Sequence, residues 1–195
     1  MNDNWMDALN KQEIIDSTVP PTDDLESAIL MTLPANNSAY TAIVRGVNNT
    51  TGIALVEAYD LDQPAASQLA NISTRGFVEA GSNVMIGGFI LGNGTGTTNV
   101  LIRAIGPSLA TANPPVAGAL ADPTLELHDE NGVLIQSNDN WKDTQQCDLE
   151  ATGIPPQNDL ESAMVVTIPT GAYTAIVAGK NGGTGVGLVE LYRLP

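Results

Sequence analysis

Acidic and amide side chains gather in one loop of the chain, and they are the residues whose types best suit site chemistry. The loop contains Asn138, Asp139, Asn140 and Asp143, and after a pair of prolines come Asp159 and Glu161. Calcium in proteins takes about six to eight oxygen ligands from groups of this kind. We therefore treat these six residues as candidate calcium ligands, and calcium as the one candidate cofactor.

The spacing of these residues also fits a purely structural interpretation. It is not that of an EF-hand loop, which needs a central glycine and a final glutamate. Asparagine and aspartate also cap short helices and close turns through their own side chains. On this interpretation the loop holds the fold together and no cofactor is required.

Catalytic arrangements are poorly represented. His128 is the only histidine, so the usual zinc sites are excluded, and no G-x-S-x-G turn presents a nucleophilic serine. Paired carboxylates are abundant, but aromatic residues make up only 4% of the chain, so an acidic glycoside hydrolase is the least favoured function. Arg75 and Arg103 lie in apolar segments and are expected to pair with carboxylates. We expect the chain not to be an enzyme.

The charge of the chain limits its partners. The formal net charge is -15, from 22 acidic and 7 basic residues, which disfavours binding to nucleic acid or to anionic membranes. The most apolar run, Gly81–Gly92, is too short and too rich in glycine to span a bilayer. Met1 is followed at once by polar residues, so no signal peptide is expected.

A long internal repeat sets the organisation of the chain. The segment Asn2–Leu61, which begins NDNW, matches Asn138–Leu194, which also begins NDNW, and the intervening segment occurs once. The chain is thus one and a half units. We expect residues 1–61 to be a half unit with second-half strands only, and residues 62–195 to be a complete unit.

Alternating apolar residues and many turn residues predict an all-β fold, an antiparallel β-sandwich or jelly roll. Glycine-containing turns at 48–52, 92–98, 129–132 and 181–185 are expected to close hairpins. Each NDNW is expected to precede a short helix, the second one ended by Gly153, and its tryptophan to plug the end of the sandwich core. In the complete unit the predicted strands are Ile72–Glu79, Val84–Leu91, Asn99–Ile105, Thr124–Asp129, Val133–Ser137, Ala163–Ile168, Ala172–Ala178 and Val186–Tyr192. In the half unit they are Ala28–Leu33, Ala39–Arg45 and Ile53–Tyr59.

Several motifs resemble a known family. The run DPTLELHDENGVLIQSNDNW, followed by LESAMVVTIPTGAYTAIVAGKNGGTGVGLVELY, resembles the bacterial pre-peptidase C-terminal domain, a secreted β-sandwich. The matching elements are Leu125–Gly132, Asn138–Asn140 and Pro169–Tyr173. The whole of Asn71–Leu194, with ISTRGFV, NVMIGGFILG, LIRAIGPSLA and GALADPTLELHD, resembles a module repeated near the ends of large secreted bacterial proteins.

This resemblance implies a non-catalytic spacer, stalk or adhesion module of an exported protein, at the cell surface or outside the cell. An uncovered half unit would expose apolar strands, so we expect it to be completed by strands of its own chain or of another copy, giving dimers or filaments. Some pre-peptidase relatives bind calcium, collagen or carbohydrate. The alternative function is therefore calcium-dependent binding of a polysaccharide or matrix protein.

Overall fold

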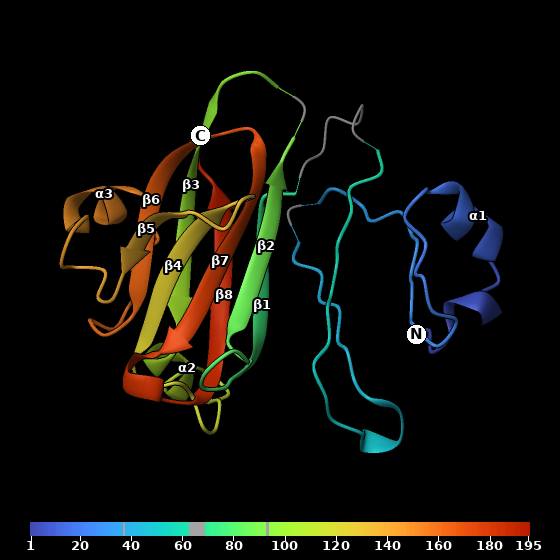
Figure 1. The fold of residues 1–195 in the computed structure, drawn as a ribbon, viewed down its shortest axis with the longest axis horizontal. Helices are drawn as coiled ribbons and strands as arrows, with labels where there is room; N and C mark the ends of the chain where they lie inside the picture. Colours follow the sequence, from blue (N-terminus) through green and yellow to red (C-terminus); the bar gives the residue numbers. More distant parts are fainter. Residues whose placement is uncertain (37, 63–68, 93) are drawn as a thin grey trace. The chain divides into compact units, whose positions relative to one another are not determined.

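The computed structural model describes residues 1–36, 38–62, 69–92 and 94–195. The chain divides into two compact units, Met1–Leu69 and Ala70–Pro195. Each unit has its own internal arrangement, which Figure 1 shows along the colour ramp from blue to red.

The unit of residues 70–195 is a β-sandwich of two four-stranded antiparallel sheets, as the sequence predicts. One sheet has the strand order β1-β8-β3-β6 and the other β2-β7-β4-β5 (Figure 1). The strands are β1 (Asn71–Val78), β2 (Met85–Leu91), β3 (Thr97–Ile105), β4 (Pro123–Asp129), β5 (Leu134–Asn138), β6 (Ser162–Pro169), β7 (Gly171–Gly179) and β8 (Gly185–Arg193).

Two apolar clusters hold this unit together. The larger lies between the sheets and takes residues from both, among them Ile102, Leu127, Met164 and Val177. The smaller groups Trp141 with Leu101, Leu149 and Ala163, beneath the short helix α3 (Gln146–Ala151). We expected Trp141 to plug the end of the sandwich core. It is buried, but it lies in this second cluster instead.

Most of the predicted hairpins are wrong, because the turns join different sheets. Only the turn at 129–132 links neighbouring strands of the described residues, β4 and β5. The turn at 181–185, which contains the 3-10 helix η3 (Lys180–Gly182), carries the chain from β7 in one sheet to β8 in the other. The connection from β2 to β3 also changes sheet, and residue 93 within it lies outside the described residues.

The unit of residues 1–69 has no strand among its described residues, so the prediction of three strands there is wrong. It contains helix α1 (Lys11–Asp16) and the 3-10 helices η1 (Trp5–Asp7) and η2 (Val47–Asn49). Residues 28–36 and 38–61 run as irregular backbone on either side of η2, coloured from blue to cyan in Figure 1.

The strand order of the complete unit explains this absence. The repeated second half contributes β6, β7 and β8, and none of these three strands pairs with another of them. β6 pairs with β3, β7 with β2 and β4, and β8 with β1 and β3, so every partner comes from the first half. A second half alone therefore has the right residues for strands but no ladder in which to place them.

The local geometry of the second half is nevertheless the same in both units. Asn48 in η2 and Asn181 in η3 adopt left-handed backbone conformations, with φ of 54° and 55°. The hydroxyl of Tyr40 donates to the carbonyl of Pro34 at 2.8 Å, and that of Tyr173 donates to the carbonyl of Pro169 at 2.9 Å. The half unit thus keeps its turns while lacking its sheets.

Candidate functional site

The two NDNW loops form the same network of hydrogen bonds. The Asn138 side chain accepts from the backbone N–H of Ala163 at 3.0 Å, and the Asn2 side chain accepts from that of Ala28 at 3.0 Å. The indole N–H groups reach backbone carbonyls on the following loop, that of Trp141 at 3.1 Å and that of Trp5 at 3.0 Å. In both copies the first asparagine joins this loop to the residue after the repeated Glu-Ser pair, which lies at the start of β6 in the complete unit, and the tryptophan joins it to the loop before that pair.

Glu161 is the most deeply buried charged residue of the described chain, with none of its surface exposed. Its Oε2 accepts from the backbone N–H groups of Gln157 and Asn158 at 3.2 and 3.1 Å and from the Ser108 hydroxyl at 2.9 Å. Its Oε1 accepts from the N–H groups of Gly106 and Ser108 at 3.2 and 2.9 Å. Five donors thus replace the water that a buried carboxylate loses.

The Gly-Pro-Ser sequence after β3 is built to reach this carboxylate. A Cβ on Gly106 would lie 2.3 Å from the carbonyl oxygen of Leu120, so only glycine fits this close approach. Pro107 begins the short helix α2 (Pro107–Ala110), where its missing N–H leaves no hydrogen bond unmade. Ser108 then supplies both an N–H and a hydroxyl to Glu161.

A buried ion pair joins β3 to β8. The Arg103 guanidinium pairs with the Glu190 carboxylate, and the side chains are only 15% and 10% exposed. It also donates to the Ile154 carbonyl at 2.7 Å and stacks over the Tyr192 ring, 5.1 Å from its centre. The expected pairing is thus confirmed for Arg103, whereas Arg75 is exposed on β1 and makes no ion pair with a described residue.

The structure places most of the six calcium candidates against other protein groups. Asp139 pairs with Lys180 at 2.6 Å, Asp159 pairs with Lys142 at 2.5 Å, and Glu161 is filled by its five donors. The Asn140 amide donates to Asp143 at 3.1 Å. Within the described residues, no three His, Cys, Asp or Glu side chains are grouped so that they could hold a metal ion.

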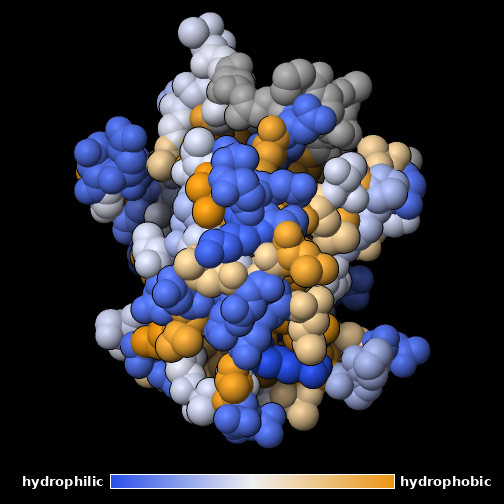
Figure 2. All heavy atoms as spheres, turned by 90° about the vertical axis from the view of Figure 1, so that its right-hand side faces the viewer, coloured by the Kyte–Doolittle hydropathy of each residue, from blue (hydrophilic) through white to orange (hydrophobic). Residues whose placement is uncertain are grey.

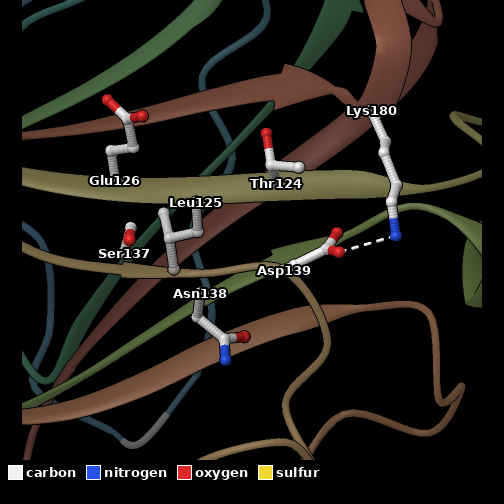
Figure 3. Close-up of a pocket in the computed structure, with 7 residues that line it drawn as sticks. All are labelled: Thr124, Leu125, Glu126, Ser137, Asn138, Asp139 and Lys180. Atoms are coloured by element: carbon white, nitrogen blue, oxygen red, sulfur yellow. Dashed lines mark ion pairs between the residues drawn. The ribbon is translucent and has the colours of Figure 1, made fainter.

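A cleft of about 340 Å³ is lined by residues of the paired strands β4 and β5, beside these candidates (Figure 3). Lys180 and Asp139 face each other at one end of it, and Glu126 lies at the other. The hydrogen bond to Asp139, strengthened by the charge of Asp122, raises the pKa of Lys180, so the ammonium stays charged. Its lining residues are Thr124, Leu125, Glu126, Ser137, Asn138, Asp139 and Lys180.

His128 lies beside Glu126, one of the residues that line this cleft. Its Nε2 is 2.9 Å from the Glu126 carboxylate and its Nδ1 is 3.1 Å from the Gly132 carbonyl, both of them acceptors. The hydrogen bonds to Glu126 and to the Gly132 backbone raise the pKa of His128. Both ring nitrogens therefore face acceptors, to which the protonated ring can donate.

The sequence analysis predicts a carboxylate partner for Arg103 but not the contact between Ser108 and Glu161. Glu161 is a candidate calcium ligand in that analysis, whereas in the structure it accepts hydrogen bonds from Ser108. The available signal was that Glu26 and Glu57 occupy the positions of Glu161 and Glu190 in the other copy. The groups of residues 103–108 that bind Glu161 and Glu190 occur once in the chain. A comparison of the two copies therefore could not reveal which groups bind these glutamates.

Comparison with solved structures gives a structural likeness, whereas the sequence comparisons give none. No protein-family model matches the sequence, and no curated protein matches it. The structure is similar to the pre-peptidase C-terminal domain of a collagenase from Bacillus anthracis, with a TM-score of 0.39 and 13% identity over 63% of this chain and 89% of that one. That domain belongs to the family whose motifs the sequence resembles. Similarity of this extent says nothing about function.

None of the helices in the described residues has the length and apolar content needed to cross a membrane.

Proposed function

We propose that the chain is a non-catalytic structural module of an exported protein, in which residues 70–195 are a folded spacer and residues 1–61 await a complementary first half. The observation that carries this proposal is the strand order. Each second-half strand pairs only with first-half strands, so the half unit can form its sheets only with a polypeptide that supplies them.

The exposure of matched residues supports the same proposal. Met164, Val177 and Val189 are at most 1% exposed in the sandwich, whereas the corresponding Ile29, Val44 and Val56 are 65%, 59% and 53% exposed. Figure 2 shows hydrophobic side chains reaching the surface at several places among hydrophilic ones. Exposed apolar residues in such number mark an interaction surface.

The number of halves favours a partner other than an identical chain. Each chain carries two second halves, residues 2–61 and 138–194, and one first half between them. A chain that lends its first half to the half unit of a neighbour leaves its own residues 138–194 uncovered. Exchange among identical copies therefore gains no buried surface, and a dimer or filament formed in this way would be no more stable than the monomer.

Co-refolding tests the proposal. The full chain is refolded from urea with an added polypeptide of residues 70–137, and the product is followed by light scattering and by far-ultraviolet circular dichroism. We expect a one-to-one complex with more strand than the two components have separately. A mixture whose spectrum is the sum of its parts, with no complex, would contradict the proposal.

Calcium-dependent binding of a polysaccharide or matrix protein is the second candidate. Its support is a set of buried oxygens without hydrogen-bond partners among the described residues, on Asp122, Asp139 and Asn140. Lys180, which pairs with Asp139 at 2.6 Å and lies 3.8 Å from Asp122, already supplies a cation there. We therefore expect millimolar calcium to leave the melting temperature unchanged. A ligand at a hundred times its Kd would stabilise the fold by about 2.7 kcal/mol, so such a rise would revive this function.

A further inference from the structure

Two glutamates of the half unit lack the partners that their counterparts have in the complete unit. Glu26 corresponds to Glu161, and its Oε2 accepts from the backbone N–H groups of Thr22 and Asp23, each at 3.1 Å. These bonds match those of Glu161 to Gln157 and Asn158. The other oxygen of Glu26 has no donor among the described residues, whereas that of Glu161 has two from the first half.

Glu57 repeats this pattern at the position of Glu190. Its carboxylate accepts from the Tyr59 hydroxyl at 2.9 Å, just as Glu190 accepts from Tyr192 at 3.0 Å. What Glu57 lacks among the described residues is the guanidinium that Arg103 brings to Glu190.

All the missing groups come from one short stretch of the first half. Arg103 supplies the guanidinium. Gly106 and Ser108, three and five residues later, supply two N–H groups and a hydroxyl. We propose that the half unit selects its partner by a strand that ends in Arg-x-x-Gly-Pro-Ser. Glu57 binds the arginine of that strand, and Glu26 binds the Gly-Pro-Ser turn. This inference rests on the proposed function.

The Glu26 loop of the half unit is already arranged to receive the Gly-Pro-Ser turn of such a strand. The loop that holds the Glu26 carboxylate has the same bonds as in the complete unit, including the 2.8 Å contact from the Trp5 N–H to the Glu26 carbonyl that matches Trp141 and Glu161. This preformed loop loses less conformational entropy on binding than a disordered loop would, whereas the segment that carries Glu57 must still order. The partner is therefore another polypeptide with an unpaired first half of this module, and its arginine suits the strongly acidic chain.

The test uses the full chain co-refolded with the polypeptide of residues 70–137, and hydrogen exchange by mass spectrometry reports amide protection in residues 28–33, 39–45 and 53–59. These peptides differ in sequence from their counterparts in residues 163–192, so their protection is read separately. We expect protection to appear with the wild-type pair. Glu26→Gln and Glu57→Gln should each weaken the complex about tenfold or more, as for a lost hydrogen bond to a charged group.

Three controls separate recognition from general effects. Glu13→Gln removes an exposed carboxylate of α1 and should leave the affinity unchanged. Ser108→Ala in the added polypeptide should weaken binding to the wild-type chain, and its effect should not add independently to that of Glu26→Gln, because both changes act on contacts of the same carboxylate. The circular dichroism of each variant alone should match wild type, since the described strands lie in the complete unit.

The outcomes distinguish this inference from the function on which it rests. Protection that is insensitive to Glu26→Gln and Glu57→Gln, or equally sensitive to Glu13→Gln, would overturn the recognition proposal while leaving strand completion in place. No protection with any pair would overturn both.

Discussion

Replacing Glu161 with glutamine tests the claim that its buried carboxylate joins the two halves of the complete unit. If the glutamine oxygen takes the place of Oε2, it still accepts from Ser108, Gln157 and Asn158. The amide NH2 then takes the place of Oε1 and faces the N–H groups of Gly106 and Ser108, which are donors themselves. Two buried N–H groups therefore lose their acceptor.

The size of the effect follows from that count. A buried donor left without a partner costs about 1–3 kcal/mol, so two of them predict a loss of about 2–6 kcal/mol for Glu161→Gln. A domain of this kind has a total stability of about 5–15 kcal/mol, so the unfolding midpoint should fall by a large fraction. Glu26→Gln is the matched control. Its carboxylate is exposed, so water replaces the lost acceptor and the change should stay within about 0.5 kcal/mol.

Urea unfolding followed by circular dichroism in the strand region measures both variants. All the described strands belong to residues 70–195, so this signal follows the complete unit. The slope of the transition should be unchanged if the unfolded surface is the same. A loss below about 1 kcal/mol for Glu161→Gln would refute the reasoning, because it lies below the cost of two buried N–H groups without an acceptor. An equal loss for Glu26→Gln would refute it as well.

Two further predictions concern the same sandwich. Gly106→Ala places a Cβ 2.3 Å from the Leu120 carbonyl oxygen and should lower the unfolding free energy by about 1–3 kcal/mol, while Gly92→Ala, where a Cβ meets nothing within 4 Å, should be near neutral; equal effects would contradict the close approach. Nuclear magnetic resonance of the single histidine should show the pKa of His128 above its ordinary value, and Glu126→Gln should lower it. Because this pKa is raised on folding, the stabilisation is complete below the unfolded pKa of about 6.5 and is lost as pH rises through the folded pKa. The stability difference between wild type and Glu126→Gln should therefore shrink from pH 5 to pH 8 (roughly the span that brackets an ordinary histidine), and a difference independent of pH would contradict it.

Local sequence patterns predicted the complete unit well. Alternation placed β1 and β2 within one residue of their observed ends, and the short helix ending before Gly153 is α3. Gly153 has a φ of 76°, the left-handed conformation for which glycine is suited, and the matching Thr18 takes a φ of 67°. The ends of these strands, the short helix and its final turn each depend on a few neighbouring residues. A local reading of the sequence can therefore predict them.

Long-range features escaped prediction for a physical reason. The residues of 28–33, 39–45 and 53–59 have the same strand pattern as their counterparts, yet they form no strand because a ladder needs a neighbour that pattern cannot supply. The turn at 181–185 has hairpin chemistry but crosses between sheets. Glu161 is acidic, as a calcium ligand would be, but its carboxylate accepts hydrogen bonds from Gly106 and Ser108. These two residues lie 55 and 53 positions away in the sequence.

The interleaved strand order also dictates how the half unit can be completed. A strand such as β8 pairs on both sides, with β1 and β3, so a partner cannot dock against a finished surface and must fold together with residues 53–59. Coupled folding of this kind costs ordering entropy but buries a large surface and gives high selectivity. In the complete unit, Glu190 contacts Arg103 within the central strand β3, and Glu161 contacts Gly106 and Ser108 just after that strand. Glu26 and Glu57 would thus bind the equivalent of β3, and the register of that strand sets its pairing with the equivalents of both β6 and β8. A partner strand shifted by one residue would lose these contacts, so the two glutamates select for the correct register.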